Sequence, residues 1–154
     1  MAQGDVVCFD QFLVDRDKKV HNLDSDTIKV GFITNAVTPL ATTADPRWGA
    51  GGSTNFSTNE VTPGGNYSAG GPSITAGASI ALSGGKSVFD SSTDISILQN
   101  GSNPTDARWG IMYNDTSTGK ECICFIDFGG VTDLTAGNFT LNWNASGIFD
   151  TDQA

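Results

Sequence analysis

The side chains best suited to nucleophilic or metal chemistry are few: one histidine and three cysteines, namely His21, Cys8, Cys122 and Cys124. A Ser-His-acid or Cys-His site needs a histidine base, and His21 is the only candidate. His21 stands where a helical pattern gives way to a strand pattern, and a ring that hydrogen-bonds nearby backbone is useful there. We therefore interpret His21 as a structural residue and predict that the protein is not an enzyme.

The cysteines and His21 also have the donor types of a zinc site. However, Cys122 and Cys124 are two residues apart in a strand pattern, which places both thiols on one face, beside Ile126. Such neighbours are poorly directed for a mutual disulfide, and a buried, inert thiol is the commoner fate of a cysteine. We predict reduced cysteines, no metal and no cofactor.

The acidic residues form pairs, and none of these pairs follows the spacing of a calcium loop. We interpret them as solvated turns, with incidental weak calcium binding as the alternative. Glycoside hydrolysis needs two carboxylates across a cleft, but acids are too plentiful here for that requirement to discriminate. The sequence also lacks a P-loop, a Gly-x-Ser-x-Gly motif and a dinucleotide-binding fingerprint between a strand and a helix.

Aromatic side chains leave sugar binding open. Alternation places Trp143 on the core face of a strand, and we expect the same of Trp109. Trp48 and Tyr67 stand in a loop-rich region instead, so they are the aromatic residues that we predict to be exposed. A small carbohydrate-binding module would use these two rings.

Composition favours one mainly β domain, residues 1–154. The chain is 38% hydrophobic, which allows one core, and its 19 glycines indicate many tight turns. With a net charge of −9, the protein lacks the excess of Lys and Arg that binding to nucleic-acid phosphates needs. The same charge disfavours contact with anionic membranes. Neither a secretory signal nor a membrane-spanning apolar run is recognisable. We expect no nucleic-acid partner and no membrane contact.

A short amphipathic helix is predicted over about residues 5–18, from the helical spacing of Val6, Phe9 and Leu13. Residues 28–32 then alternate as a strand. Residues 39–71 are rich in Gly-Gly pairs and form a long loop region, with a brief strand around Phe56. A loop this long in a compact domain is usually functional or contact-forming.

Further strand patterns follow, separated by turn signals. They lie at residues 73–82, 88–89, 95–97, 109–113, 120–128 and 139–143, with a hairpin turn at 83–86. Residues 120–128 are apolar on both faces, which indicates a central strand covered on each side. Six to eight short strands predict an antiparallel β-sandwich or jelly roll with one short N-terminal helix.

One segment of five residues occurs twice with a single difference, at 45–49 (DPRWG) and 106–110 (DARWG). The flanking residues do not match. We therefore interpret the repeated segment as Arg-Trp stacking at two corners of the fold, with an internal duplication as the alternative.

An ordered series of short motifs resembles a group of small virion proteins of tailed bacteriophages. The N-terminal match consists of Phe9, Phe12, Leu13, His21, Asn22, Leu23, Asp26, Thr27, Lys29, Val30 and Thr34. Later matches are the turn at 66–71, the strand at 108–115, and the segments 125–130 and 139–147. The sequence departs from the pattern through an insertion at residues 48–59.

This resemblance implies a decoration or cement protein, made in the host cytoplasm and bound to the capsid surface of the virion. Its partners would be the major capsid protein and further copies of itself, in a dimer or trimer. The predicted helix and the 39–71 region are the expected contact segments. The candidate contact residues are Phe9, Phe12, Leu13, Arg47, Trp48, Phe56 and Tyr67. A tail, neck or fibre-associated virion protein is the alternative within the same class.

Overall fold

The computed structural model describes residues 1–74 and 78–151, and this part of the chain is mainly β. In chain order the elements are β1 (Val6–Cys8), α1 (Asp10–Asp17), β2 (Ile28–Ile33), β3 (Pro46–Arg47), β4 (Thr54–Asn55), the 3₁₀ helix η1 (Phe56–Asn59), β5 (Ala78–Ser83), β6 (Lys86–Ser91), β7 (Ile95–Ile97), β8 (Ala107–Asn114), β9 (Cys122–Thr132), β10 (Phe139–Leu141) and β11 (Phe149–Thr151). The prediction of a mainly β chain with one short N-terminal α-helix and antiparallel sheets is confirmed.

A four-stranded antiparallel sheet forms the middle of the molecule, in the order β1-β9-β8-β2. β9 lies inside this sheet, and its residues from Cys122 to Phe128 are all buried. A strand that is apolar on both faces needs a cover on each side, and the fold supplies both covers. The prediction of a central, doubly covered strand at 120–128 is therefore confirmed.

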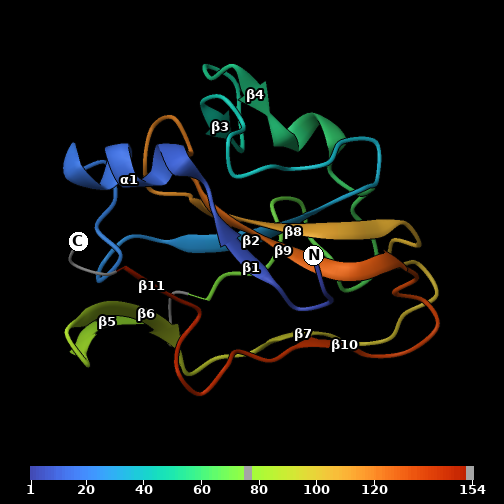
Figure 1. Ribbon diagram of the computed structural model, residues 1–154. Coiled ribbons are helices and arrows are strands. Elements are labelled where there is room, and N and C mark those ends of the chain that lie inside the picture. Colours follow the sequence, from blue (N-terminus) through green and yellow to red (C-terminus); the bar gives the residue numbers. More distant parts are fainter. Residues whose placement is uncertain (75–77, 152–154) are drawn as a thin grey trace.

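The two covers differ in kind (Figure 1). On one side lie the short parallel pair β3-β4 and η1. On the other side lie two small antiparallel sheets, β11-β6-β5 and β10-β7. Helix α1 sits at one end of the central sheet, on the β3-β4 side.

The apolar side chains form two clusters that correspond to these covers. The main core contains Phe32, Ile126 and Phe89, together with most of the other buried residues. The smaller second core consists of Phe9, Ile33, Trp48, Phe56, Trp109, Ile111, Tyr113, Cys122 and Phe125. Burial on both faces anchors the sheet, since each fully buried large side chain contributes about 1.5–3 kcal/mol.

The N-terminal helix is shorter than predicted, because residues 6–8 form a strand. β1 pairs with β9, with Val6 opposite Ile126 and Cys8 opposite Cys124. Phe9 keeps an extended backbone at the N-cap position, without a side-chain capping hydrogen bond, and the helix begins at Asp10. The apolar residues do have helical spacing, but pairing of residues 6–8 with β9 prevents the predicted first turn of the helix from forming.

The faces of β9 also differ from the prediction. Met112 lies opposite Cys124, whereas the next residue, Tyr113, lies opposite Cys122, so β9 has one extra residue at Ile123. This β-bulge breaks the alternation and turns Cys122 into the second core, while Cys124 stays in the main core. The prediction that both thiols share a face is wrong.

One further strand boundary differs, and another cannot be compared. The strand before Phe56 ends at Asn55, whose side chain accepts a hydrogen bond from the Ser57 N–H and starts the 3₁₀ turn. In the strand predicted at 73–82, residues 75–77 lie outside the described part of the chain, and β5 covers Ala78–Ser83.

Candidate functional site

The seven residues predicted to make contacts fall into two groups in the structure. Leu13 is exposed on α1, with 46% of its surface accessible, and Arg47 is partly buried. The other five are buried side chains, namely Phe9, Phe12, Trp48, Phe56 and Tyr67. The 39–71 region folds down over the central sheet, so its aromatic rings are covered. The prediction that Trp48 and Tyr67 are exposed is wrong.

Trp48 is a centre of the second core. Its ring stacks on Tyr113, with ring centroids 5.0 Å apart and an interplanar angle of 9°. It also lies directly over Gly31, where a Cβ atom would overlap the indole ring. Phe9 packs against Phe56 in the same cluster, at 5.8 Å between centroids. The structure thus brings Phe9, Trp48 and Phe56 together as an internal cover of the sheet.

Tyr67 is an internal hydrogen-bonding residue on the main-core side. Its hydroxyl accepts from the Phe32 N–H at 2.8 Å and donates to the Glu60 carboxylate at 2.9 Å. Glu60 also accepts from the Gly70 N–H, which fixes the turn that follows Tyr67. Burial, opposed by the bond from Phe32 and reinforced by Glu60, raises the pKa of Tyr67 well above its usual range.

The two DxRWG segments have different environments. Arg108 stacks over the ring of Trp109 at 3.7 Å and pairs with the buried Asp127. Arg47 instead pairs with Asp45 and Glu121, at 3.0 and 2.8 Å. The prediction of Arg-Trp stacking is therefore confirmed for the second segment, whereas in the first segment Trp48 stacks on Tyr113.

His21 belongs to a buried polar cluster around Asn114, a residue with no exposed surface. The Asn114 amide donates to Asp26 at 2.6 Å and lies 3.3 Å from Nδ1 of His21. Its oxygen accepts from the backbone N–H groups of Thr116 and Ser117. Nε2 of His21 is buried without a hydrogen-bond partner in the described part of the chain. His21 therefore joins the helix-to-strand segment to the end of β8.

Burial lowers the pKa of His21, although the carboxylates of Asp15, Glu121 and Asp26 act in the opposite direction. The folded protein thus binds a proton at His21 less readily than the unfolded chain does, whose histidine has a pKa of roughly 6.5. The stability that comes from a neutral His21 is present above this pH and is lost as the pH falls below it.

We therefore expect the free energy of unfolding to decrease between pH 7 and pH 5, by up to about 1.4 kcal/mol per pH unit for one proton. Urea unfolding at a series of pH values would measure this slope. The variant His21→Gln keeps an acceptor for Asn114 and should flatten the slope in this range. An equal slope in both proteins would contradict the assignment to His21.

The cysteines are placed as inert thiols. Burial raises the pKa of Cys8 to about 11, and it raises those of Cys122 and Cys124 well above the usual value. They are therefore protonated at neutral pH, and a protonated thiol is a poor nucleophile and metal ligand. Within residues 1–74 and 78–151, no three His, Cys, Asp or Glu side chains are grouped to hold a metal ion.

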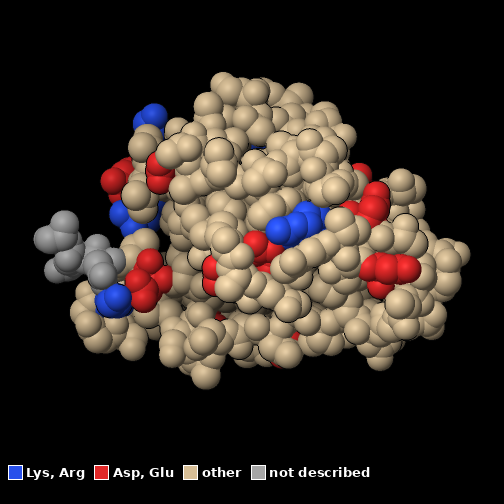
Figure 2. Space-filling model, turned by 45° about the vertical axis from the view of Figure 1, so that its right-hand side comes forward, with Lys and Arg blue, Asp and Glu red and all other residues tan. Residues whose placement is uncertain are grey.

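The surface carries apolar side chains on separate elements. The large exposed ones are Leu13, Val14, Leu40, Ile80, Leu82, Leu98 and Val131, besides Met1. Charged groups of both signs are scattered on the face shown in Figure 2, and most of that face is uncharged. Leu13 and Val14 are neighbours on α1. Leu40 precedes Ala41, whose carbonyl accepts from the Asp10 N–H at the start of that helix. Leu13 and Val14 form the candidate contact surface, here called the α1 surface.

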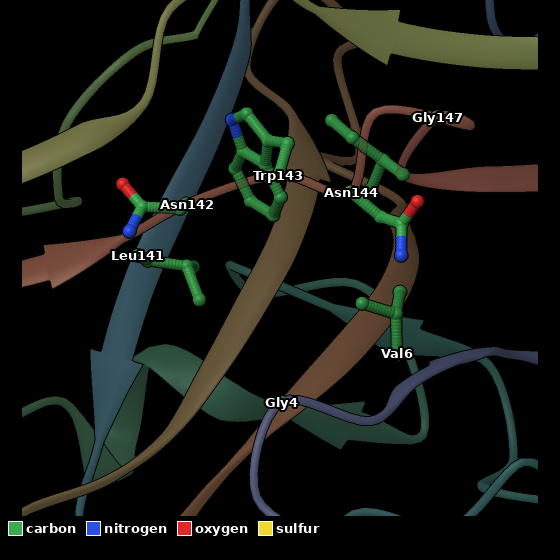
Figure 3. A pocket seen from close by; sticks show the side chains of 8 residues that line it. Gly4, Val6, Leu141, Asn142, Trp143, Asn144 and Gly147 are labelled. Carbon is green, nitrogen blue, oxygen red and sulfur yellow. The ribbon is translucent and has the colours of Figure 1, made fainter.

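Two surface pockets differ in their linings. One, of about 450 Å³, has charged walls and is lined by Arg16, Lys19, His21, Asn22, Leu23, Asp24 and Ile80. The other, of about 220 Å³, is lined by uncharged residues from the N-terminal segment and from the chain around β10 (Figure 3). Neither pocket can be predicted from sequence patterns, because each joins segments that are far apart in the chain.

The fold and these contacts define a mainly β protein whose aromatic contact candidates are largely internal. Comparison of the chain with protein-family models, with curated proteins and with solved structures gave no match. Among the described residues, no helix combines the length and the apolar character needed to cross a bilayer.

Proposed function

We propose that this protein is a non-enzymatic virion component, which binds the outer surface of a phage capsid and decorates or cements it. The ordered resemblance of the sequence to phage virion proteins suggests the class. The α1 surface is the observation that carries the proposal, because Leu13 and Val14 are each nearly half exposed side by side on one helix. We propose further that the layers of the fold form an irregular β-sandwich that acts as a rigid scaffold.

We propose that the α1 surface docks into an apolar groove of the major capsid protein, and that this groove has basic residues at its rim. Apolar side chains stabilise such a contact through burial, at about 25 cal/mol per Å². The net charge of −9 makes a basic rim complementary and an acidic one repulsive. Among the sequence candidates, Leu13 is then a contact residue, while Phe9, Phe12, Trp48, Phe56 and Tyr67 hold the scaffold, and Arg47 anchors its loop.

The contact area of one small helix is modest, so we propose that the protein binds as a symmetric dimer or trimer. Several copies of a weak contact increase the overall affinity without any new interaction. Light scattering on the purified protein measures the oligomeric state, and a strict monomer at micromolar concentration would contradict this part of the proposal.

The proposal predicts a loss of capsid binding when the α1 surface becomes polar. The double variant Leu13→Ser/Val14→Ser should bind purified phage heads about tenfold more weakly, because two apolar contacts are lost. Leu98→Ser, an exposed leucine after β7, is the matched control and should bind like the wild type. Sedimentation with heads that lack the protein gives the occupancy.

Two results would overturn the proposal: absence of the protein from purified virions, or full occupancy by the double variant. Electron microscopy with labelled protein distinguishes the main alternative, because a tail, neck or fibre-associated protein would place the label away from the head. A carbohydrate-binding module that uses Trp48 and Tyr67 is not favoured, since both rings are buried.

A further inference from the structure

The uncharged pocket has a fixed aromatic wall (Figure 3). Trp143 follows β10 and is held at two points: its backbone N–H donates to Asp94 at 3.0 Å, and its indole N–H donates to the Thr93 carbonyl at 2.9 Å. Its ring is half-buried and packs against the main core. The orientation of the indole is therefore set before any ligand arrives, which reduces the entropy cost of binding.

Amide groups lie on either side of this ring. In Figure 3 the side chains of Asn142 and Asn144 flank Trp143. The Asn144 oxygen accepts from the Ser146 N–H at 2.9 Å, which leaves its NH₂ group uncommitted among the described residues. The Asn142 side chain is exposed and makes no hydrogen bond within the described part of the chain. An amide offers both donors and an acceptor, and a hydroxyl group can pair with either.

The remaining walls are small or apolar. Val6, Leu141 and Ile148 line the pocket, together with Gly4 and Gly147. A Cβ at Gly147 would collide with Val88, whereas a Cβ at Gly4 would meet no atom within 4 Å. The pocket is thus closed by packing at Gly147 and open at Gly4, where a longer ligand can continue.

Among the described residues, no charged side chain lines this pocket, although the protein contains 8 basic and 17 acidic residues. A phosphate or carboxylate ligand would find no cation among these described lining residues, and a cationic ligand would find no carboxylate among them. A ligand that suits the pocket is neutral, has an apolar face for the indole ring and has hydroxyl groups for the amides.

We propose that this pocket binds one neutral, hexose-sized unit of a glycan. Its volume of about 220 Å³ is below the range of drug-sized pockets, which suits a single ring. The site is distinct from the buried Trp48 and Tyr67 and lies on different elements from the α1 surface. It gives the protein a second binding activity, independent of the capsid contact.

Tryptophan fluorescence tests the proposal with three neutral trisaccharides: cellotriose, maltotriose and tri-N-acetylglucosamine. Trp48 and Trp109 are buried, so Trp143 is the indole whose emission a ligand in this pocket would change most. We expect a saturable change with at least one sugar at millimolar concentration. The variant Asn142→Ala should weaken that binding about threefold to tenfold, the value of one or two hydrogen bonds.

Three further variants sharpen the test. Asn144→Asp keeps the acceptor for Ser146 but removes the NH₂ donors, and it should also weaken binding. Asn35→Ala removes an exposed asparagine elsewhere and should bind like the wild type. Leu13→Ser/Val14→Ser should retain sugar binding, which separates this proposal from the capsid contact.

The proposal would be overturned if none of the three sugars gave a saturable change up to about 50 mM. This limit corresponds to a binding free energy weaker than about −2 kcal/mol. Unchanged affinity in Asn142→Ala and Asn144→Asp, despite binding by the wild type, would overturn it as well, because the sugar would then lie elsewhere.

Discussion

Deletion of residues 2–18 is expected to unfold the protein and not to release a folded β domain. The segment contains β1, which pairs with β9 in the central sheet, so its loss leaves β9 with an unpaired edge. It also contains Phe9 and Phe12, which are fully buried in the second and main cores. Loss of each buried phenylalanine costs about 3–5 kcal/mol, and both together approach or exceed the usual total stability of about 5–15 kcal/mol.

Circular dichroism and thermal unfolding check this result. The truncated chain should lack a cooperative transition, whereas Leu13→Ser/Val14→Ser, which changes only exposed positions of the same segment, should unfold like the wild type. A truncated protein with a cooperative transition near that of the full chain would show that β1 and α1 are a detachable arm.

Trp48→Ala is expected to lower the free energy of unfolding by about 3–5 kcal/mol, the range for truncation of a large buried aromatic residue. The ring stacks on Tyr113 and lies directly over Gly31, so its removal leaves a cavity at that point of the sheet. The backbone N–H of Trp48 donates to the Lys120 carbonyl at 2.9 Å, so the surrounding loop is held in place and cannot collapse freely.

Urea unfolding at neutral pH measures this loss, and two variants control it. Leu40→Ala changes a residue of the same loop region that is 59% exposed, and it should shift stability by less than about 0.5 kcal/mol. Gly31→Ala should be destabilising like Trp48→Ala, because its Cβ displaces the same ring. If Trp48→Ala kept its stability and lost capsid binding instead, Trp48 would be a contact residue after all.

The prediction of the candidate site from sequence succeeded only in part. Of the residues proposed for contacts, Leu13 is exposed, while five aromatic side chains are internal. A loop rich in glycine gives no pattern that distinguishes a covered ring from an exposed one. The pocket at Trp143 was not predicted either, because alternation assigned that ring to the core face, and the ring packs on the core while lining a cavity.

The mainly β class can be predicted from the sequence alone, because alternation and turn residues act over a few neighbouring positions. The strands at 28–32 and 109–113, the hairpin turn at 83–86 and the doubly covered strand at 120–128 follow from such local patterns. Three features become visible only in the folded molecule: residues 6–8 join the central sheet, a bulge at Ile123 separates Cys122 from Cys124, and the 39–71 region buries Trp48. Residues 6–8 and Trp48 depend on partners far away in the chain, in β9 and at Tyr113, whereas the bulge depends on the register between β9 and its neighbour β8. Pairing and burial against such partners override local preference.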